Sequence, residues 1–204
     1  METPKTNPEI AGGNLLFPVF LKIEHLKILV VGGGFVGWEK ANALLVNCPS
    51  ASVLLVAPEI RADIVEMIEI YPNLELRHEL YHKKLLDEVD LVIAATNFKE
   101  VNLQINQDAR ACKMLVNVAD TPALCDFYLS SIVKKGDLKI AISTNGKSPT
   151  FAKRFRETLE EILPESIQSI LDNLQSIRNK LKGDFVQKLD KLNEITSLMK
   201  DSKE

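Results

Sequence analysis

Cysteine and histidine are scarce in this sequence, with three of each among 204 residues. Cys48, Cys112 and Cys125 are odd in number and contain no close pair, so they do not form a disulfide framework. No zinc-binding Cys/His spacing occurs, so no metal ligand can be assigned from the sequence. These absences argue against a disulfide-stapled secreted scaffold and favour the reducing cytoplasm.

Long apolar runs and an excess of one charge are also missing. No run approaches the ~20 residues of a membrane-spanning helix. Residues 1–14 are polar and lack the apolar core of a signal peptide, so they are interpreted as a flexible tail. Lys plus Arg is 25 and Asp plus Glu is 28, a net charge of −3, which argues against nucleic-acid binding. Neither a membrane nor a nucleic-acid partner is expected.

Hydrophobic patterning to about residue 120 alternates between strand and helix periods. Apolar runs predict five strands, at 27–31, 52–56, 74–80, 91–95 and 114–118. Helical spacing between them predicts helices at 35–46, 60–70 and 101–112. This alternation is typical of an α/β fold of Rossmann type with a parallel sheet.

The pattern changes in the second part of the chain. Runs at 127–133 and 138–143 flank a glycine-containing turn and predict an antiparallel hairpin. Ser148-Pro149 supplies an N-cap and a first-turn proline for a helix to about 163. Helical spacing returns over 167–181 and 185–199. We therefore expect a Rossmann domain (15–122), a small hairpin module (123–148) and an all-α helical domain (149–204).

A glycine motif follows the first predicted strand and opens the first predicted helix. Gly32-Gly33-Gly34-Phe35-Val36-Gly37 matches G-x-G-x-x-G. Its glycines permit a tight turn, approach of a pyrophosphate and close helix–strand packing, and the helix start favours phosphate. The alternative is a glycine-rich turn without a ligand. The position between strand and helix favours a dinucleotide site.

The second and fourth predicted strands end in residues that suit such a site. After Pro58, Glu59 either accepts hydrogen bonds from a ribose or lies in the first turn of the next helix. No arginine occupies this turn, although Arg61 is near, which favours NAD over NADP. Small residues at Ala95 and Thr96 either admit the cofactor or serve tight packing.

Two later segments carry polar groups. Asp120 ends the fifth predicted strand and is either a general base or a cap for the next turn; its position alone favours the cap. Residues 143–149 form a polar loop with hydroxyls and Lys147, followed by Lys153, Arg154 and Arg156. This basic run either binds an anionic ligand or is a solvated face.

Taken in order, these segments resemble the precorrin-2 dehydrogenase family, which includes the N-terminal part of sirohaem synthase. The resemblance covers about 15–163. Its motifs are Leu16-Phe17-Pro18-Val19-Phe20-Leu21, the glycine loop with Lys40 after it, Val56-Ala57-Pro58-Glu59, Ala94-Ala95-Thr96, Asn117-Val118-Ala119-Asp120 and Ser143-Thr144-Asn145-Gly146-Lys147-Ser148-Pro149.

The resemblance implies a homodimer, with the hairpin as dimerisation module, that oxidises the anionic tetrapyrrole precorrin-2 to sirohydrochlorin with NAD. Some members then insert ferrous iron to give sirohaem, and both outcomes stay open for this chain. A non-catalytic nucleotide-sensing Rossmann module is the competing interpretation. Such a module does not need the Asp120 and 143–149 segments.

By position, the resemblance assigns cofactor binding to the glycine loop with Phe35 and Val36, to Pro58 and Glu59, and to Ala95 and Thr96. Asp120 falls on the catalytic aspartate of the family, which reverses the preference for a cap. Substrate binding is assigned to the following residues: Asn117, Thr144, Asn145, Gly146, Lys147 and Ser148. Two residues depart from the family pattern: Gly37, often alanine in relatives, and Trp38.

Overall fold

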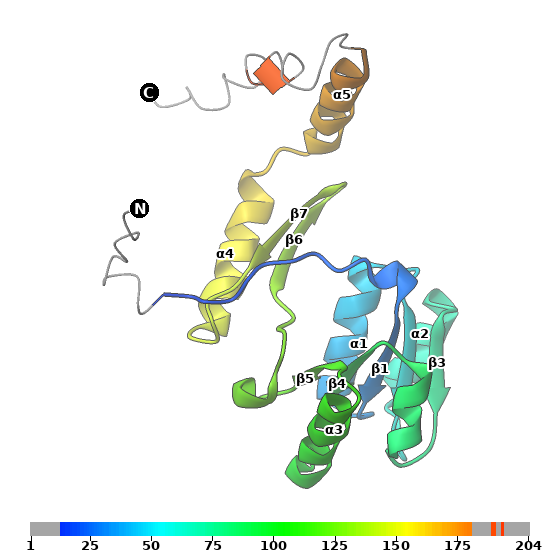
Figure 1. Cartoon of the computed structure of the whole chain (residues 1–204). Coiled ribbons are helices and arrows are strands. Elements are labelled where there is room, and N and C mark those ends of the chain that lie inside the picture. The colour runs from blue at the N-terminus through cyan, green and yellow to red at the C-terminus, as the bar shows by residue number, and fades with distance from the viewer. Residues whose placement is uncertain (1–12, 181–188, 191–192, 194–204) are drawn as a thin grey trace. The chain divides into compact units, whose positions relative to one another are not determined.

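The computed structural model describes residues 13–180, 189–190 and 193 (Figure 1). The chain divides into two compact units between Leu129 and Ser130. Most of the expected tail at 1–14, and most of the helical pattern after 180, lies outside the described residues. In the part of the chain that is described, no helix is both long and apolar enough to cross a membrane.

The first unit contains a five-stranded parallel sheet in the order β3-β2-β1-β4-β5. The strands are β1 (Lys27–Val31), β2 (Ser52–Val56), β3 (Leu74–Arg77), β4 (Leu91–Ala94) and β5 (Leu115–Val118). Val31 pairs with Val56 on one side and Ala94 on the other, so the carboxyl ends of β2, β1 and β4 are level. This order confirms the predicted Rossmann-type α/β fold and places its reversal point between β1 and β4.

Both faces of the sheet are buried, since alternate residues of β1 enter two separate hydrophobic clusters. Ile28 and Val30 pack with α1 (Phe35–Asn47) and α2 (Ala62–Ile70). Leu29 and Val31 pack with α3 (Lys99–Ala111) and the 3-10 helix η3 (Lys83–Glu88). Burial on both faces explains why the strands are continuous apolar runs without polar alternation. Two short 3-10 helices, η2 (Ile23–His25) and η4 (Pro122–Leu124), complete the unit.

The structure corrects two predicted elements of this unit. The third strand ends at Arg77 rather than residue 80, and Leu80 is 73% exposed. The apolar residues that follow, Leu85 and Leu86, are instead buried by η3, which the patterning did not predict. The second helix begins at Ala62 rather than residue 60, because Arg61 has an extended backbone.

The described part of the second unit includes the predicted hairpin and the helices α4 (Pro149–Ile162) and α5 (Ile167–Lys180). Strands β6 (Ser131–Lys135) and β7 (Leu138–Ile142) pair antiparallel around Gly136-Asp137, and Gly136 has a φ of +57°. Helix α4 contacts β6. Helix α5 reaches the hairpin turn through Gln168, whose Oε1 accepts the Asp137 N–H at 2.8 Å. The hairpin is confirmed, but its first strand covers Ser131–Lys135 rather than 127–133, because Phe127 and Leu129 pack against the core of the first unit. The boundaries at 122 and 148 stay predictions.

Candidate functional site

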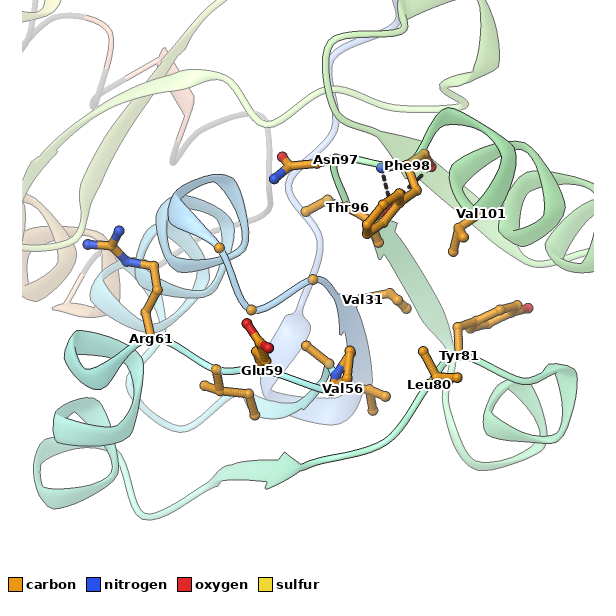
Figure 2. A pocket seen from close by; sticks show the side chains of 17 residues that line it. Val31, Val56, Glu59, Arg61, Leu80, Tyr81, Thr96, Asn97, Phe98 and Val101 are labelled. Carbon is orange, nitrogen blue, oxygen red and sulfur yellow. Dashed lines mark hydrogen bonds between the residues drawn. The ribbon is translucent and has the colours of Figure 1, made fainter.

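A cavity of about 590 Å³ opens at the carboxyl ends of β1, β2 and β4 (Figure 2). Four chain segments line it: 31–34, 56–61, 80–81 and 95–98, together with Val101. The reversal point of an open α/β sheet is where such folds bind ligands. Seven of the predicted cofactor residues lie here: Gly32, Gly33, Gly34, Pro58, Glu59, Ala95 and Thr96. The other three, Phe35, Val36 and Gly37, form the first turn of α1.

In the glycine loop, Gly32 and Gly37 have no room for a side chain, whereas Gly34 does. Gly32 has a φ of +131°, and a Cβ there would collide with the carbonyl of Ala95. A Cβ at Gly37 would collide with the Gly32 carbonyl, so α1 packs directly on the turn. At Gly34, in contrast, a Cβ would meet nothing within 4 Å. Gly32 is required by its backbone torsion, and Gly37 by the close packing of α1 on the turn in this chain, whereas Gly34 faces the cavity that it lines.

The start of α1 supplies hydrogen-bond donors to this loop. Its N-cap is Gly34, which offers no capping side chain, and the first turn carries no acidic residue. Trp38 N–H donates to Gly34 O at 3.0 Å, which leaves the three preceding N–H groups without intrahelical partners. Such a helix start stabilises an anion such as a pyrophosphate. The residues present therefore fit the phosphates of a dinucleotide.

The loop between β2 and α2 lies against the glycine loop and carries Glu59. A Cβ at Gly33 would collide with the Glu59 carbonyl, and Arg61 N–H donates to Gly33 O at 3.1 Å. The first-turn acid of α2 is Asp63, so the alternative that placed Glu59 in that turn is wrong. Figure 2 shows the Glu59 carboxylate directed into the cavity, where it can accept hydrogen bonds.

Arg61 is a cation at the same rim, and its charge is paired. Its Nη2 lies 2.7 Å from Asp63 Oδ2, and its guanidinium stands over the Phe35 ring at 5.9 Å. The hydrogen bond between the two charges lowers the pKa of Asp63 and raises the pKa of Arg61. Arg61 belongs to the cavity lining, and its charge there is offset by the Asp63 carboxylate.

A buried amide, not predicted from the sequence, fixes the segment after β4. The Asn102 side chain, on α3, is 7% exposed. Its Oδ1 accepts the Thr96 N–H at 3.2 Å and lies 2.8 Å from Thr96 Oγ1, while its Nδ2 donates to Thr96 O at 2.9 Å. Thr96 Oγ1 in turn accepts the Phe98 N–H at 3.1 Å. An asparagine on the buried stripe of a helix was the available signal, since buried polar groups need partners.

The far wall of the cavity was also missed. Leu80 and Phe98 line it and are 73% and 67% exposed, so both are apolar surfaces at its mouth. Tyr81 is partly buried, and its hydroxyl donates to Asp108 Oδ2 at 3.1 Å. Burial, then the nearby Asp108 charge, raise the pKa of Tyr81. Hydrophobic periodicity carries no signal for these residues, because Leu80 and Tyr81 lie after the end of β3 and Phe98 lies before α3.

Asp120 lies in the turn after β5 and is exposed. Its φ is +55°, a left-handed conformation uncommon for a residue other than glycine. The N-cap of η4 is Thr121, and no side chain caps that helix, so the structure does not support the cap interpretation. Ala119 N–H donates to Ala94 O at 2.9 Å, which ties the Asp120 turn to the end of β4 beside the cavity. The cavity lining itself does not include Asp120.

The predicted substrate residues fall in both units. Asn117 is 6% exposed, and its Nδ2 donates to Phe127 O at 2.8 Å within the first unit. In the second unit Ser148 Oγ accepts the Phe151 N–H at 3.2 Å, which confirms it as the N-cap of α4. Thr144 Oγ1 accepts the Ser148 N–H at 3.2 Å, so the 143–149 loop is internally bonded.

The exposed part of that loop carries positive backbone torsions and positive charge. Asn145 and Gly146 have φ values of +53° and +75°, and both are exposed, as is Lys147. Arg156 is paired with Glu160 at 2.7 Å. Within the described residues, Lys147, Lys153 and Arg154 form no ion pair, and no group of three His, Cys, Asp or Glu side chains could hold a metal ion.

Residues 19–131, more than half of the chain, match the family model described as "Putative NAD(P)-binding", and the chain belongs to this family. Its site is therefore one for a nicotinamide dinucleotide. Residues 135–162 match a second family model, described as "Sirohaem biosynthesis protein central". Together the two matches confirm the resemblance seen in the ordered motifs.

Individual relatives agree with the family matches. The chain is 36% identical over 176 residues to a "Siroheme synthase" of Psychrobacter arcticus, covering 86% of this chain and 31% of the relative. It is 38% identical over 168 residues to a "Siroheme synthase" of Pseudoalteromonas translucida, covering 82% and 35%. The chain thus spans about a third of the length of these relatives. Among solved structures it is similar to "SirC, precorrin-2 dehydrogenase", with 27% identity, a TM-score of 0.71, and 88% and 89% of the two chains covered.

Proposed function

We propose that this chain oxidises precorrin-2 to sirohydrochlorin with NAD as the hydride acceptor. The observation that carries the proposal is the contact between Ala119 N–H and Ala94 O, which joins a dinucleotide cavity to a turn bearing an exposed carboxylate. A pure nucleotide sensor needs the dinucleotide cavity but not the exposed carboxylate beside it. The name of the similar solved structure and the sirohaem match over 135–162 support the tetrapyrrole as substrate.

The chain's residues divide the chemistry between holding and proton transfer. Bound NAD supplies an acceptor for the hydride that leaves the substrate. The N–H groups at the start of α1 hold the pyrophosphate, and Asn102 keeps the segment after β4 in place. Asp120 accepts the proton that leaves with the hydride, so the substrate loses a hydride and a proton and gains one double bond.

The Glu59 carboxylate favours NAD over NADP. It enters the cavity after the end of β2, where it can accept hydrogen bonds from the hydroxyls of an adenosine ribose and would repel a 2′-phosphate. The Arg61 charge, which could otherwise attract that phosphate, is paired with Asp63. Titration with each dinucleotide tests this choice. The Kd for NAD should be lower than the Kd for NADP, and Glu59→Gln should reduce the difference between the two Kd values.

Precorrin-2 carries eight carboxylates, and the exposed cations Lys147, Lys153 and Arg154 suit such a substrate.

We further propose a homodimer formed through the hairpin. A two-stranded sheet has two unpaired edges and is marginal alone, and β6 and β7 bury only Val133. Light scattering of the purified chain should give twice the monomer mass, and a monomer would contradict this assembly.

Anaerobic absorbance spectroscopy tests the reaction. Precorrin-2 is generated in place, NAD is supplied, and ferrous iron is added last. The sirohydrochlorin spectrum should form only when both chain and NAD are present. Absence of that spectrum, with NAD binding intact, would instead support a sensing module. An iron-dependent shift faster than without the chain would add iron insertion, with ferrous iron as a second substrate.

A further inference from the structure

Strand β5 is an edge strand, yet its outer backbone groups are not left open. Val116 N–H donates to Asp126 Oδ2 at 3.1 Å, and the Asp126 N–H donates to Val116 O at 2.8 Å. Two residues further, Val118 N–H donates to Cys125 Sγ at 3.2 Å, and the thiol donates to Val118 O at 3.1 Å. Cys125 and Asp126 thus occupy the hydrogen-bonding positions that a sixth strand would otherwise fill.

The Cys125 thiol also reaches the far side of the Asp120 turn. Its Sγ lies 3.4 Å from Thr121 O as well as 3.1 Å from Val118 O. Burial raises the pKa of Cys125, so at neutral pH the thiol keeps the proton that it donates. One sulfur atom therefore brackets the turn, contacting the residue before Ala119-Asp120 and the residue after it.

The bracketed turn contains a backbone conformation that needs support. The left-handed φ of +55° at Asp120 carries a cost for a residue with a Cβ, and such conformations persist where surrounding contacts determine them. Ala119 N–H is held by Ala94 O on the inner side of the sheet. On the outer side Thr121 N–H donates to Val118 O at 3.2 Å and closes the turn, and the Cys125 thiol adds side-chain contacts to the same two residues.

We propose that Cys125 is a positioning residue, whose thiol sets the backbone of the turn and thereby the direction of the Asp120 carboxylate. This inference rests on the proposed function, in which Asp120 accepts a proton from the substrate. Cys125 touches neither substrate nor cofactor in this scheme and acts only through Asp120.

The experiment compares Cys125→Ala, which removes both donor and acceptor, with Cys125→Ser, which keeps both. Cys48→Ala is the matched control, since Cys48 is also a half-buried thiol of the same unit but lies between α1 and β2, away from β5 and the Asp120 turn. Turnover is measured for each variant, alone and combined with Asp120→Asn. Hydrogen exchange of the Val118 amide, which donates to Cys125 Sγ, reports on the turn independently of turnover.

In Cys125→Ala, kcat should fall on the order of 10- to 100-fold, the scale of a misplaced reacting group, with the Kd for NADH unchanged within about twofold. The double variant should be within about twofold of Asp120→Asn alone, because residues acting as a unit are not additive. Cys125→Ser should recover most of the activity, and Cys48→Ala should keep it. Exchange of the Val118 amide should rise about tenfold in Cys125→Ala, but not in Cys125→Ser or Cys48→Ala.

If hydrogen exchange of the Val118 amide is unchanged in Cys125→Ala, the Cys125 thiol does not hold the turn, whatever the turnover. Wild-type kcat in that variant, or a loss that adds fully to the loss in Asp120→Asn, would overturn its action through Asp120. If the unmodified chain shows no NAD-dependent turnover while hydrogen exchange responds as expected, the proposed function is wrong, but the Cys125 thiol still holds the turn. The two failures are therefore distinguishable.

Discussion

Gly34 separates the requirements of the cofactor from those of the fold. Its φ of −85° and ψ of −168° are extended values open to any residue, and a Cβ there meets no atom within 4 Å. Gly34→Val should therefore fold, with at most about 1 kcal/mol lost from a poorer N-cap. Its side chain would, however, occupy the cavity beside the N–H groups at the start of α1.

The loss in affinity follows from those N–H groups. A hydrogen bond to a charged group contributes about 1.5–3 kcal/mol, so displacing one phosphate contact should weaken the Kd for NAD about 10- to 150-fold. Gly37→Ala is the opposite case, since its Cβ would collide with the Gly32 carbonyl. Overpacking of this kind costs about 1–3 kcal/mol, or about 2–12 °C in Tm.

Calorimetric titration with NAD and NADH, alongside thermal unfolding without ligand, measures both quantities for each variant. The expected pattern is weak binding with a near-normal Tm for Gly34→Val, and a lowered Tm for Gly37→Ala. A wild-type Kd in Gly34→Val would refute the placement of the pyrophosphate at this loop. A neutral Tm in Gly37→Ala would refute the argument from packing.

Three further outcomes are expected. Asn102→Leu leaves the Thr96 N–H and carbonyl without their side-chain partner. The free energy of unfolding, measured in urea, should fall by about 1–3 kcal/mol, and NAD should bind more weakly. Unchanged values of both would show that Asn102 does not hold the segment after β4. Asp120→Asn should lower turnover on the order of 10²- to 10⁴-fold with the Kd for NADH unchanged, and wild-type turnover would exclude it as the base. The raised pKa of Tyr81, due to burial and Asp108, gives the folded state a stability that is complete below the ordinary tyrosine pKa of about 10 and is lost as pH rises beyond it. Urea midpoints should consequently fall more steeply above pH ~10 in the unmodified chain than in Tyr81→Phe, and parallel curves would contradict this.

Much of the fold could be predicted because its signals are local. Buried parallel strands give apolar runs, and the glycine loop announces a strand–helix junction within six residues. The Ser148-Pro149 pair likewise predicted the start of α4, which the structure confirms. The same locality explains the errors at 60 and 80, where an apolar residue extends the pattern beyond the element, before α2 begins and after β3 ends.

The amino-acid sequence by itself determined the order of strands and helices, the dinucleotide fingerprint and the family. Only the tertiary structure decided that Glu59 enters the cavity, that Arg61 is already paired, and that Trp38 packs on the core with its ring 5.6 Å from Phe35. It alone joined Asn102 to Thr96 and Cys125 to Val118. The physical reason is that a period reports which face of an element is buried, whereas a polar side chain's partner depends on which backbone groups the folded chain leaves unpaired beside it.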